Sequence, residues 1–337
     1  MSRMPTPPSP GRRFRLTRAK LIVTRRLPES VERQLAAHFD VTLNATDVPS
    51  TAASLVDALR TADGILCTLP DRFTADVLAS APCRSRILAQ FGVGHDNIDL
   101  VAARAAGIVV TNTPGVLTED TADLTIALLL ATARRVGEGE RLLRSATWTG
   151  WRPTQLLGTR VSGKTLGIVG FGRIGRAVAR RAQHGFGMTV IVHSPSLPPG
   201  AEAAHGIRRC ASLDELLAAS DFVSLHCPAT PATRHLIDAA RLAQMKRTAI
   251  LINTARGDVV DEGALVRALA SRTIAAAGLD VYEHEPTMSP ELLAMEHVVL
   301  LPHLGSATVE SRVAMGERAL ANLSAFFAGE PPPDRID

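Results

Sequence analysis

The 337-residue sequence is poor in the features that mark several large classes of protein. Its four cysteines, Cys67, Cys83, Cys210 and Cys227, are scattered and lack the C-x-x-C spacing of a zinc or redox site. No apolar run approaches the length of a membrane span, and the N-terminus lacks the apolar segment of a secretory signal. We therefore expect neither a disulfide framework, a metal site nor a membrane protein. A reducing cytoplasm fits this composition best.

An excess of charge of one sign is also missing. The net charge is only +4, so the composition does not support binding of nucleic acid. Several arginines gather near the N-terminus, but prolines and serines surround them, and we expect residues 1–19 to form a disordered tail. The rest, with 46% hydrophobic and 21% charged residues overall, is typical of a globular protein with a sizeable core, and the length predicts two domains.

Residues 165–182 contain the clearest functional pattern. A short apolar run is followed by GFGRIG at residues 170–175 and then by a helix rich in Ala and Arg. Gly170 allows a tight turn, Gly172 lets the backbone approach a pyrophosphate, and Gly175 lets the helix lie close to the strand. The phosphates would lie at a helix N-terminus, where N–H groups and the helix dipole favour negative charge. The strand–turn–helix context favours dinucleotide binding over an ordinary glycine-rich turn.

Strand and helix patterns alternate along the chain, which predicts parallel sheets covered by helices on both faces. Before the glycine-rich turn we expect strands at residues 21–23, 64–67, 87–89 and 109–110. From the turn onward we expect six strands, at residues 166–169, 190–192, 222–225, 250–252, 276–279 and 298–301. A final helix over residues 309–327 has no strand after it, and the proline-rich residues 331–333 predict an extended tail.

These patterns predict an α/β protein with two doubly wound parallel-sheet domains, Rossmann-like or flavodoxin-like, and a cleft between them. The first domain is discontinuous and comprises residues 20–112 and 306–337, because we expect the final helix to fold back onto it. The second domain, residues 113–305, contains the glycine-rich turn and is the predicted dinucleotide-binding domain. The first is then the predicted substrate domain.

The second strand of the dinucleotide unit ends in VHSPS, without the carboxylate that binds the ribose 2′-OH in NAD-dependent proteins. Its absence removes a repulsion toward a 2′-phosphate, and Ser194 leaves a hydroxyl donor. Pro195 stands where a phosphate-binding Arg is usual, so Arg208 or Arg209 would have to supply that charge. We favour NADP(H) over NAD(H).

Three further stretches carry reactive side chains just past predicted strands: Arg256 in NTARG, Glu285 in LDVYEHEP and His303 in LPHLG. In a parallel sheet these strand ends share one edge with the phosphate turn. An Arg holds a substrate carboxylate in fork geometry. An imidazolium protonates the alkoxide that hydride transfer leaves on a ketone, and a carboxylate fixes the imidazole's tautomer. Each residue alone has a structural interpretation, but together they predict carbonyl–hydroxyl redox chemistry.

At these motifs the sequence resembles the D-isomer-specific 2-hydroxyacid dehydrogenase family. The matching stretches run from about Phe91 to Thr308 and are FGVGHDNID, TPGVLTEDTAD, GIVGFGRIGRAVARR, LINTARGDVVDE, AGLDVYEHEP and LPHLGSAT. The resemblance implies Arg256 as the substrate-carboxylate binder, His303 as the acid/base and Glu285 as its partner. It also implies that backbone N–H groups around Val93 and Gly94 bind the substrate carboxylate. The implied cofactor contacts, beside the three glycines of the turn, are Phe171, Arg173, Ile174, Ser194, Cys227, Pro228, Thr254, Asp280 and Gly305.

Residues 148–153, WTGWRP, and the Leu69–Pro70 loop resemble the glyoxylate/hydroxypyruvate reductase branch of this family. A small pocket beside Leu69 would suit either substrate. Trp151 is implied to reach the partner subunit's active site in a homodimer, although a core or interface tryptophan is an equal reading. We expect an NAD(P)H-dependent reductase of small 2-oxo acids. The alternatives are a D-lactate- or phosphoglycerate-type dehydrogenase and, from another class, a dinucleotide-sensing corepressor-like binding protein.

Overall fold

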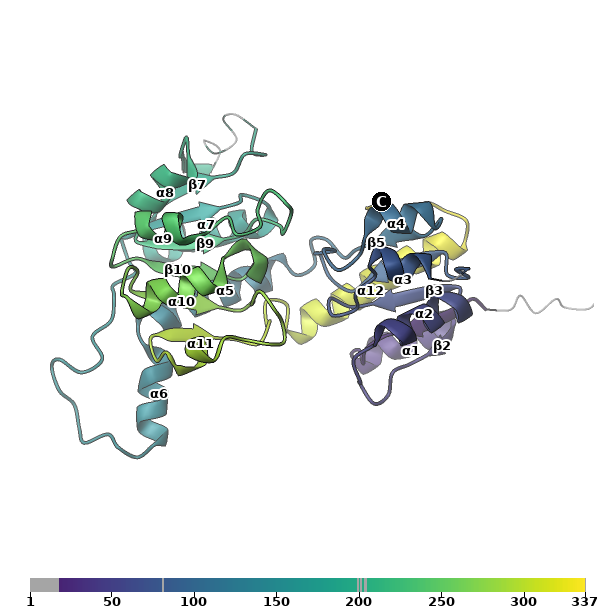
Figure 1. Ribbon diagram of the computed structural model, residues 1–337, viewed down its shortest axis with the longest axis horizontal. Coiled ribbons are helices and arrows are strands. Elements are labelled where there is room, and N and C mark those ends of the chain that lie inside the picture. The colour runs from purple at the N-terminus through teal and green to yellow at the C-terminus, as the bar shows by residue number, and fades with distance from the viewer. Residues whose placement is uncertain (1–17, 81, 199, 201, 203–204, 337) are drawn as a thin grey trace, which may run out of the picture. The chain divides into compact units, whose positions relative to one another are not determined.

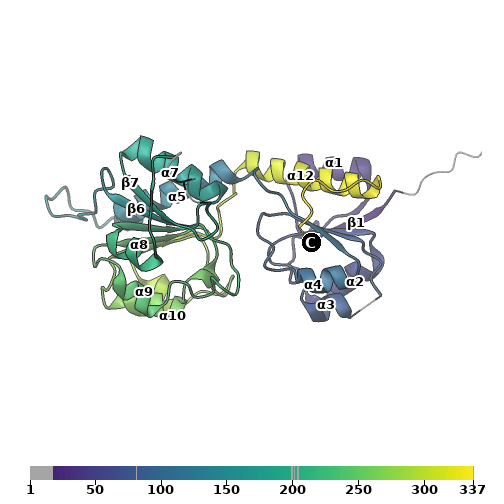
Figure 2. The same cartoon turned by 90° about the horizontal axis from the view of Figure 1, so that it is seen from above.

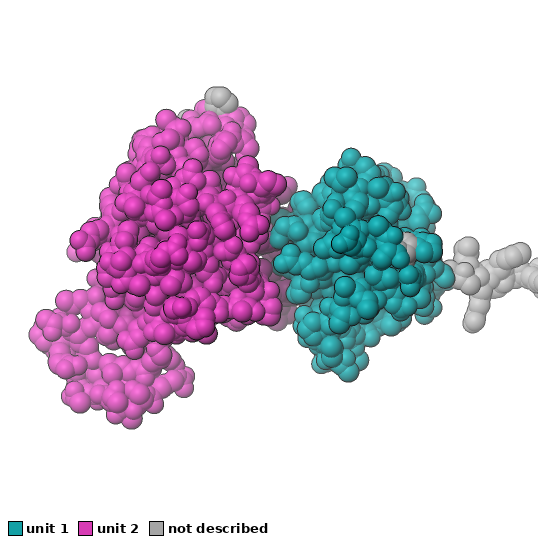
Figure 3. Space-filling view, viewed as in Figure 1, with its two compact units in different colours: residues 1–112, 316–337 teal, residues 113–315 magenta. Residues whose placement is uncertain are grey.

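The protein is described from a computed structural model, which covers residues 18–80, 82–198, 200, 202 and 205–336. The tail predicted for residues 1–19 therefore lies almost wholly outside the described residues. The chain divides into two units, which Figure 3 shows in different colours. Unit 1 comprises Met1–Asn112 and Gly316–Asp337, and unit 2 comprises Thr113–Met315. The second boundary between the units therefore lies within the last helix, between Met315 and Gly316. The predicted boundary, between residues 305 and 306, precedes that helix.

Unit 1 is built on a five-stranded parallel sheet with the strand order β2-β1-β3-β4-β5. Its strands are β1 (Lys20–Val23), β2 (Asp40–Thr42), β3 (Gly64–Cys67), β4 (Ile87–Gln90) and β5 (Val109–Thr111). β3 and β4 are buried at every position, as expected for strands covered on both faces. Its helices are α1 (Glu29–His38), α2 (Ala52–Thr61), α3 (Ala75–Ala79), α4 (Leu100–Ala105) and the C-terminal part of α12 (Val309–Phe327). Figure 2 shows α1 and α12 on one face of this sheet and α2, α3 and α4 on the other.

Side-chain caps explain where three of these helices begin. The hydroxyls of Thr51 and Thr74 accept hydrogen bonds from the N–H groups of Ser54 and Val77, and Asp99 does the same for Ala102. Each cap satisfies a backbone donor that has no partner within the helix, which typically stabilises the helix by about 1 kcal/mol.

Unit 2 contains a seven-stranded parallel sheet with the order β12-β11-β10-β9-β6-β7-β8. Its strands are β6 (Thr165–Val169), β7 (Thr189–His193), β8 (Arg208–Arg209), β9 (Phe222–Leu225), β10 (Ile250–Asn253), β11 (Ala276–Leu279) and β12 (Val298–Leu300). The helices are α5 (Thr118–Ala133), α6 (Val136–Arg144), α7 (Arg173–Phe186), α8 (Leu213–Ala219), α9 (Ala239–Gln244), α10 (Glu262–Ala270), α11 (Pro290–Ala294) and the start of α12, with a 3₁₀ turn η2 (Gly257–Val259). Figure 2 shows α5 and α7 on one face of the sheet and α8, α9 and α10 on the other. The predicted fold class, two parallel-sheet α/β units, is confirmed.

Two strands were missed by the sequence analysis, and both lie at the outer edge of a sheet. β2 is three residues long with no buried position, and β8 consists of two arginines. An edge strand of this kind is fixed by pairing with its neighbour rather than by an apolar run. The hydrophobic pattern therefore carries no signal for it.

The strand order of unit 2 reverses beside β6. From β6 the chain proceeds outward through β7 and β8, and it then returns to place β9 on the other side of β6. Ligands of open parallel sheets bind at the carboxyl ends of the strands flanking such a reversal. For unit 2 these are the ends of β6 and β9.

The C-terminal segment is hydrogen-bonded to strand β5. Thr111 and Arg335 form an antiparallel bridge, and the N–H of Ile336 donates to the carbonyl of Val110 at 3.0 Å. The segment predicted as an extended tail therefore continues beside β5. Among the described residues, no helix is long and apolar enough to cross a membrane.

Candidate active site

The glycine-rich turn between β6 and α7 has the geometry that a pyrophosphate requires. Gly170 has φ of +90°, and a Cβ there would lie 2.7 Å from the backbone nitrogen of Cys227. A Cβ on Gly175 would lie 2.4 Å from the carbonyl oxygen of Gly170, whereas a Cβ on Gly172 would meet open space. Gly172 is the N-cap of α7 and has no side chain to cap it, so the first N–H groups of the helix are left for an anion.

Other predicted cofactor residues follow the neighbouring strands at the same edge of the sheet. Ser194 follows β7 and is buried, and Cys227 and Pro228 follow β9. Burial raises the pKa of the Cys227 thiol to about 11, so this group is neutral at physiological pH. Thr254 follows β10, and its hydroxyl lies 2.8 Å from that of Thr125 on α5. The residues of the turn, Phe171, Arg173 and Ile174, complete the set.

Asp280 anchors the loop that presents His303. One of its carboxylate oxygens accepts the N–H of Leu304 at 2.6 Å and the other accepts that of Gly305 at 2.8 Å. Its carbonyl accepts the N–H of His303, and Thr121 on α5 donates to the carbonyl of Gly305. Asp280 is 1% exposed, and burial raises the pKa of its carboxyl above the ordinary value. The sequence suggested Asp280 as a cofactor contact, but these bonds give its carboxylate a role in holding the loop.

His303 and Glu285 form a hydrogen-bonded pair. Nδ1 of His303 lies 2.8 Å from Oε2 of Glu285, and the N–H of Tyr282 donates to the other carboxylate oxygen at 3.0 Å. Burial, the largest influence, raises the pKa of Glu285, but the bond and charge of His303, the N–H of Tyr282 and the charge of Arg256 together hold it below its ordinary value. Glu285 is therefore a carboxylate at neutral pH. Because a carboxylate only accepts, the imidazole donates from Nδ1, and Nε2 is left for a reactant.

Arg256 lies at the end of β10, close enough for its charge to act on Glu285. Asn253 fixes the local backbone, since its side-chain nitrogen donates to the carbonyl of Arg256 at 2.8 Å and its oxygen accepts the N–H of Ala255. The next residue, Gly257, packs directly on the neighbouring loop: a Cβ there would lie 1.9 Å from the carbonyl carbon of Tyr282. Within unit 2, the structure thus brings together the loops that carry Arg256, Glu285 and His303.

A second set of carboxylates ties the same loops together, and the sequence analysis did not identify it. The backbone N–H of Glu283 donates to the carboxylate of Glu262, and the N–H of Glu262 donates to that of Glu283. Glu283 also accepts a bond from Nε2 of His235 at 2.6 Å. Although burial opposes it, the bond from His235 contributes to a pKa of Glu283 below the ordinary value. No local pattern predicts this contact, because His235, Glu262 at the start of α10 and Glu283 lie far apart in the sequence.

Three predicted substrate contacts, Leu69, Val93 and Gly94, belong to unit 1. Leu69 lies against the loop after β4, since a Cβ on Gly92 would be 3.3 Å from its side chain. Two side-chain amides donate hydrogen bonds to backbone carbonyls of this loop. Asn112 donates to the carbonyl of Val93 at 2.8 Å, and Gln90 donates to that of Gly94 at 3.2 Å.

Trp151, a further predicted substrate contact, belongs to unit 2 and is largely exposed. It is 80% exposed and lies in the long connection between α6 and β6. Figure 1 shows α6 and this connection extending away from the rest of the unit.

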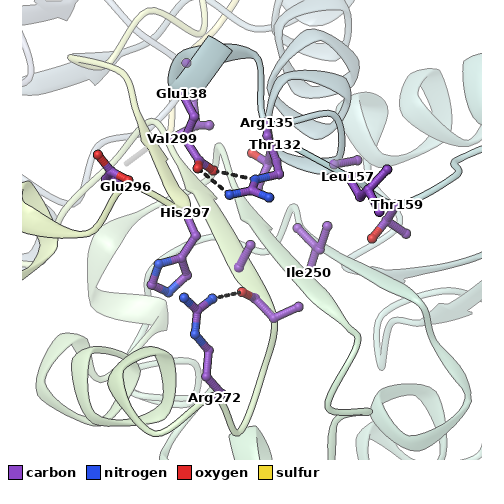
Figure 4. Close-up of a pocket in the computed structure, with 15 residues that line it drawn as sticks. Thr132, Arg135, Glu138, Leu157, Thr159, Ile250, Arg272, Glu296, His297 and Val299 are labelled. Atoms are coloured by element: carbon purple, nitrogen blue, oxygen red, sulfur yellow. Dashed lines mark hydrogen bonds and ion pairs between the residues drawn. The ribbon is translucent and has the colours of Figure 1, made fainter. Parts of the chain in front are cut away.

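A cavity of about 330 Å³ in unit 2 lies at the opposite edge of the sheet. Figure 4 shows His297 and Arg272 on one side of it and the Arg135–Glu138 ion pair on another. Ile250 and Ala276, the first residues of β10 and β11, also line it. None of the predicted site residues is among its lining residues, so this cavity is separate from the candidate active site.

Comparison with known proteins agrees with this assignment. The family described as "D-isomer specific 2-hydroxyacid dehydrogenase, NAD binding domain" matches residues 126–305. The glyoxylate reductase of Thermococcus litoralis is 45% identical over 322 residues, which cover 94% of this chain and 96% of that protein. The glyoxylate reductase of Aeropyrum pernix is 47% identical over 329 residues, with 96% and 97% covered.

The chain is thus an NAD(P)-dependent oxidoreductase. More narrowly, it belongs to the D-isomer specific 2-hydroxyacid dehydrogenase family. Among solved structures, the NADPH-dependent glyoxylate/hydroxypyruvate reductase of Sinorhizobium meliloti, in complex with NADP and malonate, matches with a TM-score of 0.84 at 36% identity and covers 95% of this chain and 97% of that one. A glyoxylate reductase from Paecilomyes thermophila gives a TM-score of 0.82 at 34% identity, with 95% and 99% covered.

Proposed function

We propose that this enzyme reduces glyoxylate to glycolate, and hydroxypyruvate to D-glycerate, with NADPH as the hydride donor. The observation that carries the proposal is the bond between His303 and Glu285 at the same sheet edge as the glycine-rich turn, with the charge of Arg256 reaching Glu285. The glyoxylate reductases that share about half of its sequence support this choice of substrate.

The reaction needs one hydride and one proton. A nicotinamide cofactor held at the glycine-rich turn would supply the hydride. Nε2 of His303 donates the proton to the carbonyl oxygen, and the Glu285 carboxylate stabilises the imidazolium that holds this proton. The guanidinium of Arg256 binds the substrate carboxylate and polarises the adjacent carbonyl. In unit 1 we assign the N–H groups at Val93 and Gly94 to binding of a substrate carboxylate, and Leu69 to a small substrate pocket.

The test is the loss of absorbance of NADPH or NADH with a panel of glyoxylate, hydroxypyruvate, pyruvate and phosphohydroxypyruvate. We expect the highest kcat/KM with the first two, and loss of most turnover in His303→Ala with cofactor affinity unchanged. Preference for pyruvate or phosphohydroxypyruvate would instead favour a lactate- or phosphoglycerate-type enzyme. No oxidation with any of the four would overturn the proposal.

We infer that NADP(H) is preferred because Arg209 is available for the 2′-phosphate. Its guanidinium lies on the turn after β7, where it donates to the carbonyl of Leu197 at 3.0 Å and to that of Ser194 at 3.4 Å. The neighbouring Arg208 is paired with Glu215 instead. Of the two arginines that the sequence left open, Arg209 is the one that we assign to this role.

The matched pair of variants is Arg209→Gln and Arg208→Gln. Since a hydrogen bond to a charged group contributes about 1.5–3 kcal/mol, we expect Arg209→Gln to lower kcat/KM for NADPH by roughly 10- to 100-fold and to leave that for NADH unchanged. Arg208→Gln is expected to leave both unchanged. Equal losses with both cofactors would count against a 2′-phosphate contact.

We also propose a homodimer that forms through the segment of residues 136–157. Large apolar side chains are exposed along it, including Leu143, Trp151 and Leu157 at 62%, 80% and 66%. Exposed apolar groups gathered on one projecting segment are typical of a protein interface. In the dimer, Trp151 reaches the active site of the partner subunit.

Sedimentation analysis tests this proposal. We expect a dimer for the wild type and a monomer for Leu143→Glu, because a charge would be buried in the interface. Trp151→Ala is expected to stay dimeric and to lose affinity for substrate. A monomeric wild type would overturn the dimer.

The prediction of a cytoplasmic location is kept as part of this proposal, because all four cysteines are free thiols. We assign unit 2 to binding of the dinucleotide and unit 1 to binding of the substrate.

A further inference from the structure

The C-terminal segment carries a buried carboxylate that the proposed reaction does not use. Asp334 is 8% exposed and accepts two hydrogen bonds from the guanidinium of Arg318, at 2.6 and 2.7 Å. Asn322 donates to the same carboxylate at 3.0 Å, and its side-chain oxygen accepts the N–H of Asp334 at 2.9 Å. Both partners lie on α12, so these bonds fix the segment on that helix.

Asn112 connects this cluster to the predicted substrate loop. Its N–H donates to the carbonyl of Asp334 at 3.2 Å, and its carbonyl accepts the side-chain amide of Asn322 at 3.1 Å. Its own side-chain nitrogen donates to the carbonyl of Val93 at 2.8 Å. Asn112 is 8% exposed, so three separate parts of unit 1 meet at one buried residue, two at its backbone and one at its side chain.

The bond to Val93 determines where an N–H group points. A trans peptide unit is planar, and its C=O and N–H point in opposite directions. Holding the carbonyl of Val93 toward Asn112 therefore turns the N–H of Gly94 to the opposite side of the loop. Within the described residues, no backbone or side-chain acceptor takes the N–H of Val93 or Gly94. These are the donors that the proposed function assigns to the substrate carboxylate.

We propose that Asn112 is a positioning residue for the substrate, and that Asp334 of the C-terminal segment holds Asn112 in place. The inference rests on the proposed function, since it concerns the 2-oxo acid site. It adds the C-terminal segment to that site. Asp334 and Asn322 hold the backbone of Asn112, whose side chain then holds Val93, and none of the three contacts the reacting atoms. Because unit 2 binds the cofactor, the effect is confined to the substrate.

The experiment compares Asn112→Ala and Asp334→Ala with the control Asn44→Ala. Asn44 also lies in unit 1 and donates from its side chain to two backbone carbonyls, but it follows the edge strand β2 rather than β4. Each protein is assayed for KM and kcat with glyoxylate and NADPH, for Kd of NADPH by nicotinamide fluorescence, and for Tm. The Kd of oxamate, an unreactive analogue of a 2-oxo acid, is measured by calorimetry on the cofactor-loaded protein.

For Asn112→Ala we expect KM and the oxamate Kd to rise about tenfold, as loss of one orienting hydrogen bond predicts. Asp334→Ala should raise both by a smaller factor, while kcat and the NADPH Kd stay within about twofold of the wild type. Asn44→Ala should leave all four unchanged. An unchanged KM in Asn112→Ala and Asp334→Ala, with or without a lower Tm, would mean that the cluster is only structural and would overturn the proposal. An equal rise in Asn44→Ala would do the same.

The oxamate measurement separates this inference from the proposed function. If the wild type binds oxamate but reduces no 2-oxo acid, the proposed function fails, and a weaker oxamate Kd in Asn112→Ala still supports the inference. If the wild type neither reduces glyoxylate nor binds oxamate, both are overturned. The conservative variant Asn112→Gln, which keeps the donor, should recover part of the lost affinity.

Discussion

Replacing Glu285 with Gln isolates the charge of the carboxylate that pairs with His303. The amide keeps the size of the side chain and an oxygen that can accept from Nδ1, but it no longer stabilises the imidazolium. A hydrogen bond to a charged group contributes about 1.5–3 kcal/mol. Because the Glu285 side chain is 36% exposed, solvent screens part of this effect and we expect the lower end of the range. A loss of about 1.4 kcal/mol corresponds to roughly a tenfold lower rate.

The assay is kcat/KM for glyoxylate reduction at neutral pH. We expect Glu285→Gln to lower it by about tenfold, because the amide no longer stabilises the imidazolium that donates the proton. The control is Glu283→Gln, which changes a carboxylate of the same loop that is bonded to His235 instead. It should lower kcat/KM by a smaller factor. An unchanged kcat/KM in Glu285→Gln, or an equal loss in both variants, would refute the assigned pairing.

Three further predictions concern other parts of unit 2. Arg256→Ala should lower kcat/KM for glyoxylate by roughly 100-fold or more, since a charged bidentate contact is lost, and should leave the fluorescence-measured NADPH Kd unchanged. Gly257→Ala should destabilise the protein by about 3 kcal/mol in urea unfolding, because its Cβ would lie 1.9 Å from the Tyr282 carbonyl carbon. Burial lowers the pKa of His226 from 6.5 to about 4. The unfolded state then takes up the proton first, so the unfolding free energy should fall by about 1–3 kcal/mol as the pH drops through this range, and less steeply in His226→Asn.

Most of the fold could be predicted from local patterns. Buried parallel strands such as β3 and β10 are short apolar runs bounded by turns, and all ten expected strands are present. The final helix, predicted over residues 309–327, has those bounds in the structure. β2 and β8 were not predicted, because an edge strand needs only a neighbour to pair with and neither strand carries an apolar pattern.

The reactive residues of the candidate site could be predicted from the sequence, but the residues that hold its loops in place could not. Its reactive groups follow strand ends, so parallel topology alone brings Arg256, Glu285 and His303 to one edge. The roles of the residues that hold the site's loops could not be predicted in this way. Asp280, Glu283 and Asn112 act through hydrogen bonds to backbone groups of distant segments. A contact of that kind depends on which loops fold side by side and leaves no periodic trace in the chain.

The sequence by itself determined the two parallel sheets, the phosphate turn and the chemistry of the three reactive side chains. These follow from local rules: apolar runs form buried strands, and only glycine tolerates the φ of Gly170 beside the backbone of Cys227. Tertiary structure alone decided that Arg209 rather than Arg208 lies on the turn after β7, and that the end of the chain is held at Asn112. Such choices depend on hydrogen bonds between residues far apart in the chain, and these bonds form only once the sheets have set the positions of the loops.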